Sequence, residues 1–168
     1  MGLRPPAPLS AEHQVEAFNC GVEVLDQWLR RYALRNQQAG AARTFVVTDD
    51  EHNVVGYYSL AAGSVDHITA TARATKGLAR HPIPVMVLAR LAVDRRYQGR
   101  KLGAGLLRDA ILRTLAVSEQ AGVRALLVHA KNDTARRFYA RYGFEPSPID
   151  PLVMMLLIKD ARRALGST

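Results

Sequence analysis

Residues 85–107, "VMVLARLAVDRRYQGRKLGAGLL", place a β-branched-rich run directly before a glycine-rich turn and an apolar pattern with helical spacing. The run 85–94 predicts a buried central strand, and Leu106 opens the helical pattern. Glycines at positions 99, 103 and 105 allow the backbone to approach a ligand closely, because no Cβ intervenes. The turn therefore predicts an anion site, since free N–H groups and the helix dipole meet at a helix N-terminus.

The glycine spacing excludes two common nucleotide-binding loops. The turn contains neither the GxxxxGK[ST] pattern of nucleoside-triphosphate loops nor the GxGxxG pattern of dinucleotide-binding folds. An R-x-x-G-x-G pattern remains, from Arg100 to Gly105. Taken alone, a purely structural glycine turn is the alternative to a phosphate site.

The other segments alternate between strand and helix patterns. Residues 15–39 carry apolar side chains at helical spacing, and "TFVVTD" with "VVGYYSLAAGSV" predicts a hairpin. Residues 66–82 predict a loop with a short helix. After the central helix ends near Gly122, "RALLVHA" predicts a second buried strand, "DTARRFYARYG" a short helix, and "VMMLLIKD" a last strand with a basic tail. This order predicts an α/β (α+β) fold.

Length and composition narrow the class of protein. A chain of 168 residues has the length of one domain, which we expect over residues 15–168, with 1–14 as a mobile, proline-rich lead-in. We expect no secretion signal and no membrane span, because no apolar run approaches about eighteen residues. A single cysteine, Cys20, agrees with a cytoplasmic location. The net charge of +8 favours nucleic acid or a phosphate-rich cofactor as partner, with a merely soluble basic surface as the alternative.

Two motifs resemble those of a known family. R-x-x-G-x-G is similar to the pyrophosphate-binding motif R-x-x-G-x-[GA] of the GNAT acetyltransferases. Residues 129–144, "HAKNDTARRFYARYGF", resemble the family's later element, in which an asparagine opens a helix and FYxxxGF follows. The resemblance implies the GNAT fold, a mixed central sheet of about six to seven strands flanked by helices, with a splayed central strand pair holding acetyl-CoA. It also implies an acetyl-CoA-dependent N-acetyltransferase.

A narrower resemblance extends toward the N-terminus, and together the matches cover roughly residues 15–158. "FNCGVEVLDQWLRRYALRNQQAGAARTFVV" and the following "VVGYYSLAAGSV" are similar to GNAT toxins of type II toxin–antitoxin systems. This implies acetylation of the free α-amine of aminoacyl-tRNA, which blocks translation. Implied partners are the charged tRNA, a cognate ribbon-helix-helix antitoxin and a second copy in a homodimer. Two alternatives stay open: a GNAT enzyme acting on a small-molecule amine or a protein N-terminus, and a non-catalytic CoA sensor or RNA-binding module.

The resemblance also assigns roles to residues. Tyr139 is the candidate catalytic acid that protonates the departing CoA thiolate, and a core aromatic is its structural alternative. Asn132 bonds the cofactor's arm, although an N-cap explains it equally well. Leu91–Val93 act through their backbone, by pairing with the pantetheine arm and polarising the thioester carbonyl, with core packing as the alternative. The predicted cofactor-binding set is Leu91, Ala92, Val93, Arg100, Lys101, Leu102, Gly103, Ala104, Gly105, Asn132 and Tyr139.

The fraction of an amine that is neutral near physiological pH distinguishes the two kinds of substrate amine. Near pH 7.4 an α-amine with a pKa of about 7.7–8.0 is about a quarter neutral, whereas a lysine amine is about a thousandth neutral. The central strand contains no carboxylate base, and Asp94 at its end is expected to cap or turn, which favours an α-amine. Glu23, Asp26 and Asp66 stay open as bases, and His129 is expected to be structural. We expect no metal site.

Basic residues outside the turn are candidate contacts to tRNA phosphates. A solvated basic surface is the alternative for each of them. The candidates lie on the first helix and around the segment before the central strand: Arg30, Arg35, Arg73, Lys76, Arg80 and Arg90.

Overall fold

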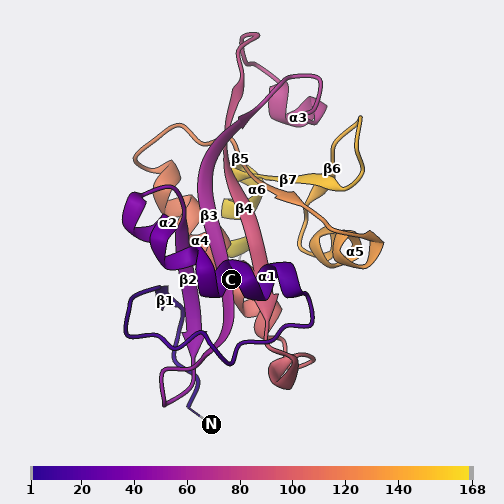
Figure 1. Cartoon of the computed structure of the whole chain (residues 1–168). Helices are drawn as coiled ribbons and strands as arrows, with labels where there is room; N and C mark the ends of the chain where they lie inside the picture. The colour runs from indigo at the N-terminus through magenta and orange to yellow at the C-terminus, as the bar shows by residue number, and fades with distance from the viewer. Residues whose placement is uncertain (1, 167–168) are drawn as a thin grey trace. The chain divides into compact units, whose positions relative to one another are not determined.

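The computed structural model describes residues 2–166, and Figure 1 shows the elements in chain order. The helices and strands are β1 (Ala7–Pro8), α1 (Glu23–Arg31), α2 (Ala33–Ala39), β2 (Arg43–Thr48), β3 (Val54–Val65), α3 (Ala72–Thr75), β4 (Ile83–Val93), the 3₁₀ turn η1 (Arg95–Tyr97), α4 (Leu102–Ser118), β5 (Ala125–His129), α5 (Asp133–Arg141), β6 (Glu145–Pro146), β7 (Val153–Leu157) and α6 (Ile158–Gly166).

Within residues 2–166 the hydrogen-bonded strands follow the order β1-β2-β3-β4-β5-β7-β6. Strands β2 and β3 form the expected antiparallel hairpin. Strands β4 and β5 are parallel over four residue pairs, Val85–Leu88 with Ala125–Val128. Strand β7 is antiparallel to both β5 and β6. The predicted mixed sheet of six to seven strands flanked by helices is therefore confirmed.

The chain divides into two compact units. Unit 1 is Met1–Ala61 with Ala89–Ala110, and unit 2 is Ala62–Leu88 with Ile111–Thr168. One acetyltransferase domain over residues 15–168 stays a prediction.

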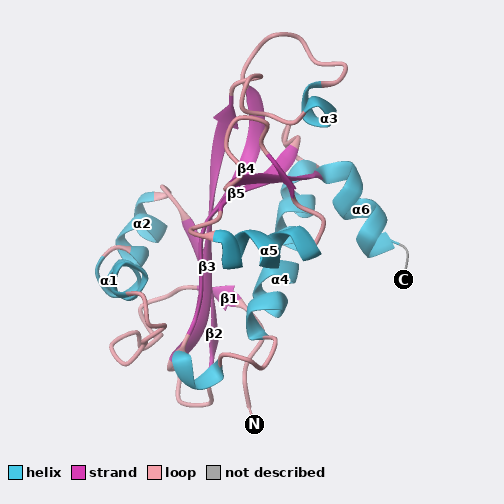
Figure 2. Ribbon diagram, turned by 90° about the vertical axis from the view of Figure 1, so that its right-hand side faces the viewer, coloured by secondary structure: helices cyan, strands magenta, loops and turns pink. Residues whose placement is uncertain are grey.

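In unit 1, helices α1 and α2 cover one face of β2 and β3, and the first turns of α4 cover the other (Figure 2). The adjacent Tyr57 and Tyr58 are both buried, because consecutive strand residues project to opposite faces. The Tyr57 hydroxyl donates to the Leu25 carbonyl of α1 at 2.7 Å, and the Tyr58 hydroxyl bonds the Asp109 carboxylate of α4. The core on the α1 side consists of Leu9, Phe18, Leu29, Ala33, Val46, Val54, Tyr57 and Ala92.

In unit 2, strands β5 and β7 form the centre of a second apolar cluster. All five residues of β7 are buried, as are the first four of β5, which agrees with their unbroken apolar sequences. The cluster comprises Ala70, Ala74, Ile83, Val85, Ala125, Leu127, Val153, Met155 and Leu157. Within the described residues no helix is long and apolar enough to cross a membrane.

Three segments differ from the sequence-based expectation. Residues 15–22 are not helical, because Asn19 and Gly21 form a local turn and the Cys20 N–H is bound by the Asp26 carboxylate at 2.9 Å. In the expected mobile lead-in 1–14, β1 pairs with β2 and Leu9 is buried, because β2 would otherwise present an open edge. Finally, Ile158–Gly166 is a helix rather than strand and tail, since Ile158 and Ala161 are buried at helical spacing.

Candidate active site

The C-terminal half of β4 has backbone groups that its neighbours do not use. The Asp94 N–H donates to the Val55 carbonyl of β3 at 2.9 Å. Because successive strand residues direct their N–H groups to opposite edges, the N–H groups of Leu91 and Val93 point away from β3. The pairing of β4 with β5 ends at Leu88, so within the described residues strand β5 offers no paired carbonyl to the N–H groups of Leu91 and Val93. The side chain of Ala92 is buried in the unit 1 core, which agrees with the core packing given above as the alternative role of this residue.

The turn after β4 is held in an uncommon backbone conformation. Gly99 has a φ of 80° and Lys101 has a φ of 63°, so two residues of three are left-handed. A non-glycine residue in this region is uncommon, and strained backbone of this kind clusters at functional sites. Helix α4 begins at Leu102, and the first helical hydrogen bond runs from the Gly105 N–H to the Lys101 carbonyl at 3.1 Å. The N–H groups of the first helical turn are therefore directed out of the helix without intrahelical partners.

The surface in front of this helix end is open. A Cβ at Gly105 would meet no atom within 4 Å, and a Cβ at Gly103 would meet only Val93, at 3.8 Å. Arg100 and Lys101 are exposed, and the Arg100 guanidinium lies 5.4 Å from the Tyr97 ring centroid. Leu102 and Ala104 are half-buried, so they anchor the helix while the glycines stay accessible. Backbone donors, a helix N-terminus and two exposed cations fit a pyrophosphate group.

Asp94 holds the start of this turn in place. Its side chain is 2% exposed, and its carboxylate accepts from the Asn19 N–H at 3.1 Å and from the Arg96 N–H and Nε at 3.0 Å. Burial raises the pKa of Asp94, but these hydrogen bonds outweigh that effect and hold the pKa below its usual value. The sequence-based expectation that Asp94 caps a turn agrees with its place at the N-cap of η1.

Sequence reasoning missed the part of this network that comes from the N-terminal segment. The Asn19 carbonyl accepts from the Arg95 N–H at 2.8 Å. The Gln98 amide donates to the Val93 carbonyl at 2.8 Å and to the Cys20 carbonyl at 3.0 Å. Asn19 and Cys20 lie more than seventy residues from the partners they bind in this turn, and no local signal connects them.

In unit 2, Asn132 is the N-cap of α5. Its side-chain oxygen accepts from the Ala135 N–H at 2.9 Å, so the structural role weighed for this residue is present. Asp133 in the first turn forms ion pairs with Arg136 and Arg137. Asn132 itself is exposed, which leaves its amide N–H₂ accessible to a ligand.

Tyr139 has a buried ring and an unpaired hydroxyl. Its ring packs edge-on against Phe138 and Phe144, with centroids 5.1 and 5.4 Å away. Among the described residues the hydroxyl has no hydrogen-bond partner, yet no buried polar side-chain atom is left unsatisfied, so the hydroxyl must open to solvent. Burial raises the pKa of Tyr139 to about 12. The hydroxyl is therefore protonated at neutral pH and available as a donor.

The predicted RNA-contacting cations differ in their surroundings. Arg73 binds the carboxylates of Asp160 at 2.8 Å and Glu145 at 2.5 Å, and the Arg90 guanidinium lies 3.9 Å from the Trp28 ring centroid. Their engagement within their own units does not support phosphate binding by these two residues. Arg30 is exposed but donates to the Phe18 carbonyl at 3.0 Å.

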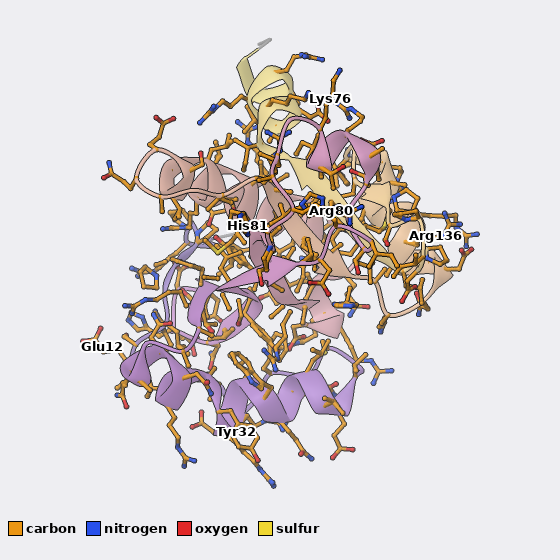
Figure 3. The ribbon with its side chains drawn as sticks, turned by 90° about the horizontal axis from the view of Figure 1, so that it is seen from above. Glu12, Tyr32, Lys76, Arg80, His81 and Arg136 are labelled. Carbon is orange, nitrogen blue, oxygen red and sulfur yellow. The ribbon has the colours of Figure 1, made fainter. Side chains whose placement is uncertain are left out.

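The other three cations are available. The side chains of Arg35, Lys76 and Arg80 are exposed and make no ion pair among the described residues. Figure 3 shows Lys76 and Arg80 on the segment around and after α3. The charge of these residues is therefore not offset by a carboxylate.

The candidate bases are placed as follows. Asp26 is buried and holds the Cys20 N–H, and Glu23 accepts from the Gln27 amide at 2.9 Å, so both have structural partners. Asp66 and His129 are exposed in unit 2. In residues 2–166 no cluster of three or more histidine, cysteine or carboxylate side chains could hold a metal ion.

Comparison with known proteins places this geometry in a family. The acetyltransferase (GNAT) domain model matches residues 41–146. The tRNA-acetylating toxin of Mycobacterium tuberculosis is 48% identical over 165 residues, which is 98% of each chain. The solved structure of AtaT complexed with acetyl-methionyl-tRNAfMet has a TM-score of 0.90 at 26% identity, over 97% of this chain and 99% of the other.

A further solved structure contains the cofactor and a partner. It is a tyrosine-to-phenylalanine mutant of the AtaT toxin bound to the C-terminus of the antitoxin AtaR and acetyl-CoA. Its TM-score is 0.85 at 26% identity, over 98% of this chain and 99% of the other. Because the family model spans more than half of the chain and the mycobacterial relative aligns over nearly all of it, the chain belongs to the GNAT acetyltransferase family.

Proposed function

We propose that this chain transfers acetyl from acetyl-CoA to the free α-amine of aminoacyl-tRNA and is the toxin of a toxin–antitoxin pair. The observation that carries the proposal is the 48% identity to a tRNA-acetylating toxin over 98% of both chains. The solved AtaT complex with acetyl-methionyl-tRNAfMet supports the same substrate class. Acetylation of the α-amine leaves no nucleophile for peptide-bond formation, so translation stops.

The turn of unit 1 holds the cofactor in this proposal. The N–H groups of Leu102, Gly103 and Ala104 bond the pyrophosphate oxygens, and Arg100 and Lys101 add positive charge. The open surface at Gly103 and Gly105 supports this assignment, because a ligand can approach the backbone there. The N–H groups of Leu91 and Val93 bond the pantetheine arm and polarise the thioester carbonyl. Asn132 adds a side-chain donor to the arm.

Acetyl-CoA supplies the acetyl group as an activated thioester. Tyr139 donates its hydroxyl proton toward the departing sulfur. Its pKa of about 12 lies about 3.5 above that of an alkyl thiol, so full transfer to the thiolate costs about 5 kcal/mol. This fits within a barrier of about 17 kcal/mol, which corresponds to about one turnover per second. Tyr139 therefore acts first as a hydrogen-bond donor to the developing thiolate and completes the transfer as the amine loses its proton.

No carboxylate base is required for an α-amine. About a quarter of such an amine is neutral near pH 7.4, so water can accept the proton released on attack, and water returns a proton to the Tyr139 oxygen after the CoA thiol has formed. Among the described residues, Glu23 and Asp26 are engaged in structural hydrogen bonds, which agrees with this route.

Exposed cations contact the RNA backbone in this proposal. Arg35, Lys76 and Arg80 carry charges without carboxylate partners, and Arg30 has one donor engaged on a backbone carbonyl. Such contacts weaken with salt and carry little sequence information. Arg73 and Arg90 support the fold.

The proposal includes partners and place of action. The complex of AtaT with the antitoxin AtaR supports a cognate antitoxin for this chain. We further propose that this antitoxin is a ribbon-helix-helix protein. We also propose that each toxin chain forms one acetyltransferase domain, that two chains form a homodimer, and that the toxin acts in the cytoplasm.

An acetyl-transfer assay tests the function directly. Purified protein is given labelled acetyl-CoA and either aminoacylated tRNA, the same tRNA after deacylation, or a panel of polyamines and peptides with free N-termini. We expect label on charged tRNA only, and its release when the aminoacyl ester is hydrolysed. Label on polyamines or peptides but not on charged tRNA would instead support the small-amine or protein-terminus activity.

A further inference from the structure

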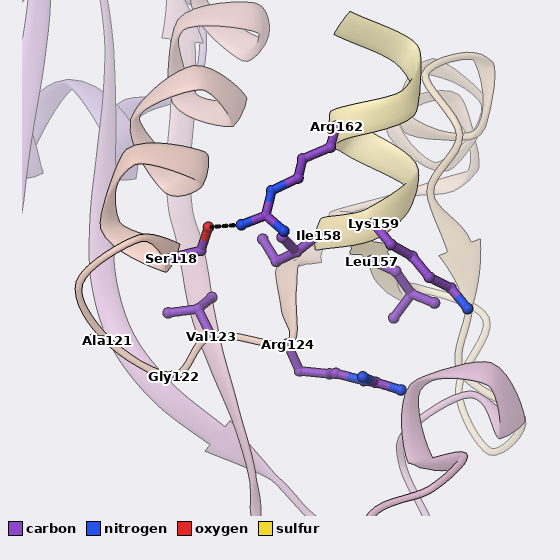
Figure 4. A pocket seen from close by; sticks show the side chains of 9 residues that line it. All are labelled: Ser118, Ala121, Gly122, Val123, Arg124, Leu157, Ile158, Lys159 and Arg162. Carbon is purple, nitrogen blue, oxygen red and sulfur yellow. Dashed lines mark hydrogen bonds between the residues drawn. The ribbon is translucent and has the colours of Figure 1, made fainter. Parts of the chain in front are cut away.

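A cavity in unit 2 has none of the residues assigned above to the cofactor or to acetyl transfer in its lining. It has a volume of about 300 Å³ and is lined by the end of α4, the loop that leads to β5, the end of β7 and the first turns of α6. Figure 4 shows its lining residues. Leu157 and Ile158 provide an apolar wall, and Arg124, Lys159 and Arg162 provide three cationic side chains. No carboxylate is among the lining residues described.

Arg124 is oriented by neutral groups. Its Nε donates to the Ala74 carbonyl at 3.0 Å, and its Nη2 donates to the carbonyls of Lys76 at 3.1 Å and Arg73 at 3.4 Å. Carbonyl oxygens hold a guanidinium in place without cancelling its charge. Arg124 is therefore already ordered before a ligand binds, so binding costs little further side-chain entropy, and the positive charge of Arg124 stays available to an anion.

The other two cations are also weakly compensated. The Arg162 Nη2 lies 3.2 Å from the Ser118 Oγ and 3.5 Å from the Glu119 carboxylate, and that pair is exposed, so solvent screens it. Lys159 is exposed and forms no ion pair among the described residues. The neighbouring Asp160 binds Arg73 instead. The cavity thus has an excess positive charge that the protein does not neutralise.

We propose that this cavity is a phosphate-binding site. The Arg162 guanidinium, which donates one N–H to the Ser118 Oγ, offers its other donors to the oxygens of a phosphate mono- or diester. Arg124 and Lys159, whose side chains point away from Arg162 in Figure 4, add positive charge to the cavity wall. The volume lies at the lower end of ligand sites, which suits a phosphate and the atoms next to it rather than a whole cofactor. A phosphate of this kind belongs either to an RNA backbone or to a small phosphorylated molecule. The RNA source rests on the proposed function, but the site itself does not.

A pair of adjacent substitutions tests the site in the full-length protein. Arg162→Gln removes a lining charge, and Arg163→Gln removes the same charge one residue along α6 from a side chain that does not line the cavity. Dissociation constants are measured for inorganic pyrophosphate and for deacylated tRNA, with acetyl-CoA at saturation so that the glycine turn is blocked. Arg162→Lys retains the charge and is the conservative control.

We expect Arg162→Gln to weaken phosphate binding at least fivefold and Arg163→Gln to change it less than twofold, with Arg162→Lys close to the unmodified protein. Loss of tRNA affinity, with a salt slope reduced by about one, identifies an RNA backbone phosphate. Loss of pyrophosphate affinity alone identifies a small phosphorylated ligand. Equal effects of the two glutamine variants, or none, would overturn the site.

A second variant and a parallel activity assay separate failure of the phosphate site from misfolding and from failure of the proposed function. Lys159→Gln alters an exposed side chain without an ion pair and replaces Arg162→Gln if that variant does not fold. Acetyl transfer to charged tRNA is measured in parallel on the unmodified protein. Absence of transfer with intact pyrophosphate binding contradicts the proposed function alone, whereas normal transfer with no charge-dependent binding contradicts only the phosphate site.

Discussion

The glycine turn of unit 1 and helix α5 of unit 2 present their predicted cofactor contacts in different ways. In the proposed function the turn contacts the cofactor through its backbone: two left-handed residues, Gly99 and Lys101, lead into a helix end whose first N–H groups have no intrahelical partner. Helix α5 with its N-cap is proposed to act through side chains, the Asn132 amide and the Tyr139 hydroxyl. Ligand binding at a backbone site is impaired by added side-chain atoms and by loss of the residues that hold the turn in place. Function at a side-chain site is impaired by the loss of a single donor or acceptor atom.

Removal of one oxygen from α5 is expected to have the largest effect on catalysis. Tyr139→Phe keeps the ring packed against Phe138 and Phe144 but removes the proton donor. We expect kcat to fall about 10²- to 10⁴-fold, the range for loss of a general acid. Calorimetry should show acetyl-CoA affinity changed by less than about threefold. A kcat within threefold of the unmodified enzyme would remove Tyr139 from the mechanism.

Addition of one carbon to the turn should mainly affect cofactor affinity. The new methyl group of Gly103→Ala meets only Val93, at an ordinary contact distance, so the fold accepts it. It faces the surface assigned to the pyrophosphate, and we expect acetyl-CoA binding to weaken about tenfold or more. Gly105→Ala is the matched control, because the R-x-x-G-x-[GA] pattern accepts alanine there. Equal effects of the two substitutions on binding would contradict a cradle centred on Gly103.

The support of the turn can be tested through Asp94. Asp94→Asn replaces this buried carboxylate with a neutral amide of the same shape. We expect it to lower the free energy of unfolding by about 1–3 kcal/mol, because charge-assisted hydrogen bonds are lost. The folded-state pKa of Asp94 lies below its usual value, so its contribution is present above about pH 3.9 and is lost as the pH falls through the folded pKa. Denaturant titrations at pH 7 and pH 3 should therefore show a smaller difference between the two proteins at the lower pH. An unchanged difference would contradict this linkage.

The smallest effect is expected at Asn132, where two roles can be separated. Asn132→Ser retains an N-cap oxygen, whereas Asn132→Ala loses the bond to the Ala135 N–H and should destabilise the protein by about 1 kcal/mol. If the amide also bonds the cofactor, both variants should weaken acetyl-CoA binding about threefold, although only one is destabilised. Thermal denaturation and calorimetry measure the two quantities. Full affinity in the serine variant would leave the cap as the role of Asn132.

Local patterns predicted the parts of the fold that depend on local physics. Strand β4, helix α4 and the hairpin of β2 and β3 followed from β-branched runs, helical spacing and a polar turn. Periodicity did not reveal the ends of elements that depend on distant partners. Residues 15–22 are non-helical because the Asp26 carboxylate and the turn of β4 bind their backbone. The final helix needed a buried position for Ala161, which only packing supplies.

For the site, the sequence alone determined the spacing of Arg100, Gly103 and Gly105, the Asn132 cap and the FYxxxGF segment, because each depends on residues adjacent in the chain. The resemblance of these motifs to those of the GNAT family implied the family and its fold, and the comparisons confirmed both. The tertiary structure decided which charges are available. Arg73 and Arg90 look like Arg80 in the sequence, but carboxylates seventy or more residues away and the Trp28 ring engage the first two. The same holds for Asp94, whose partner Asn19 is seventy-five residues distant, because charge compensation depends on proximity in space rather than along the chain.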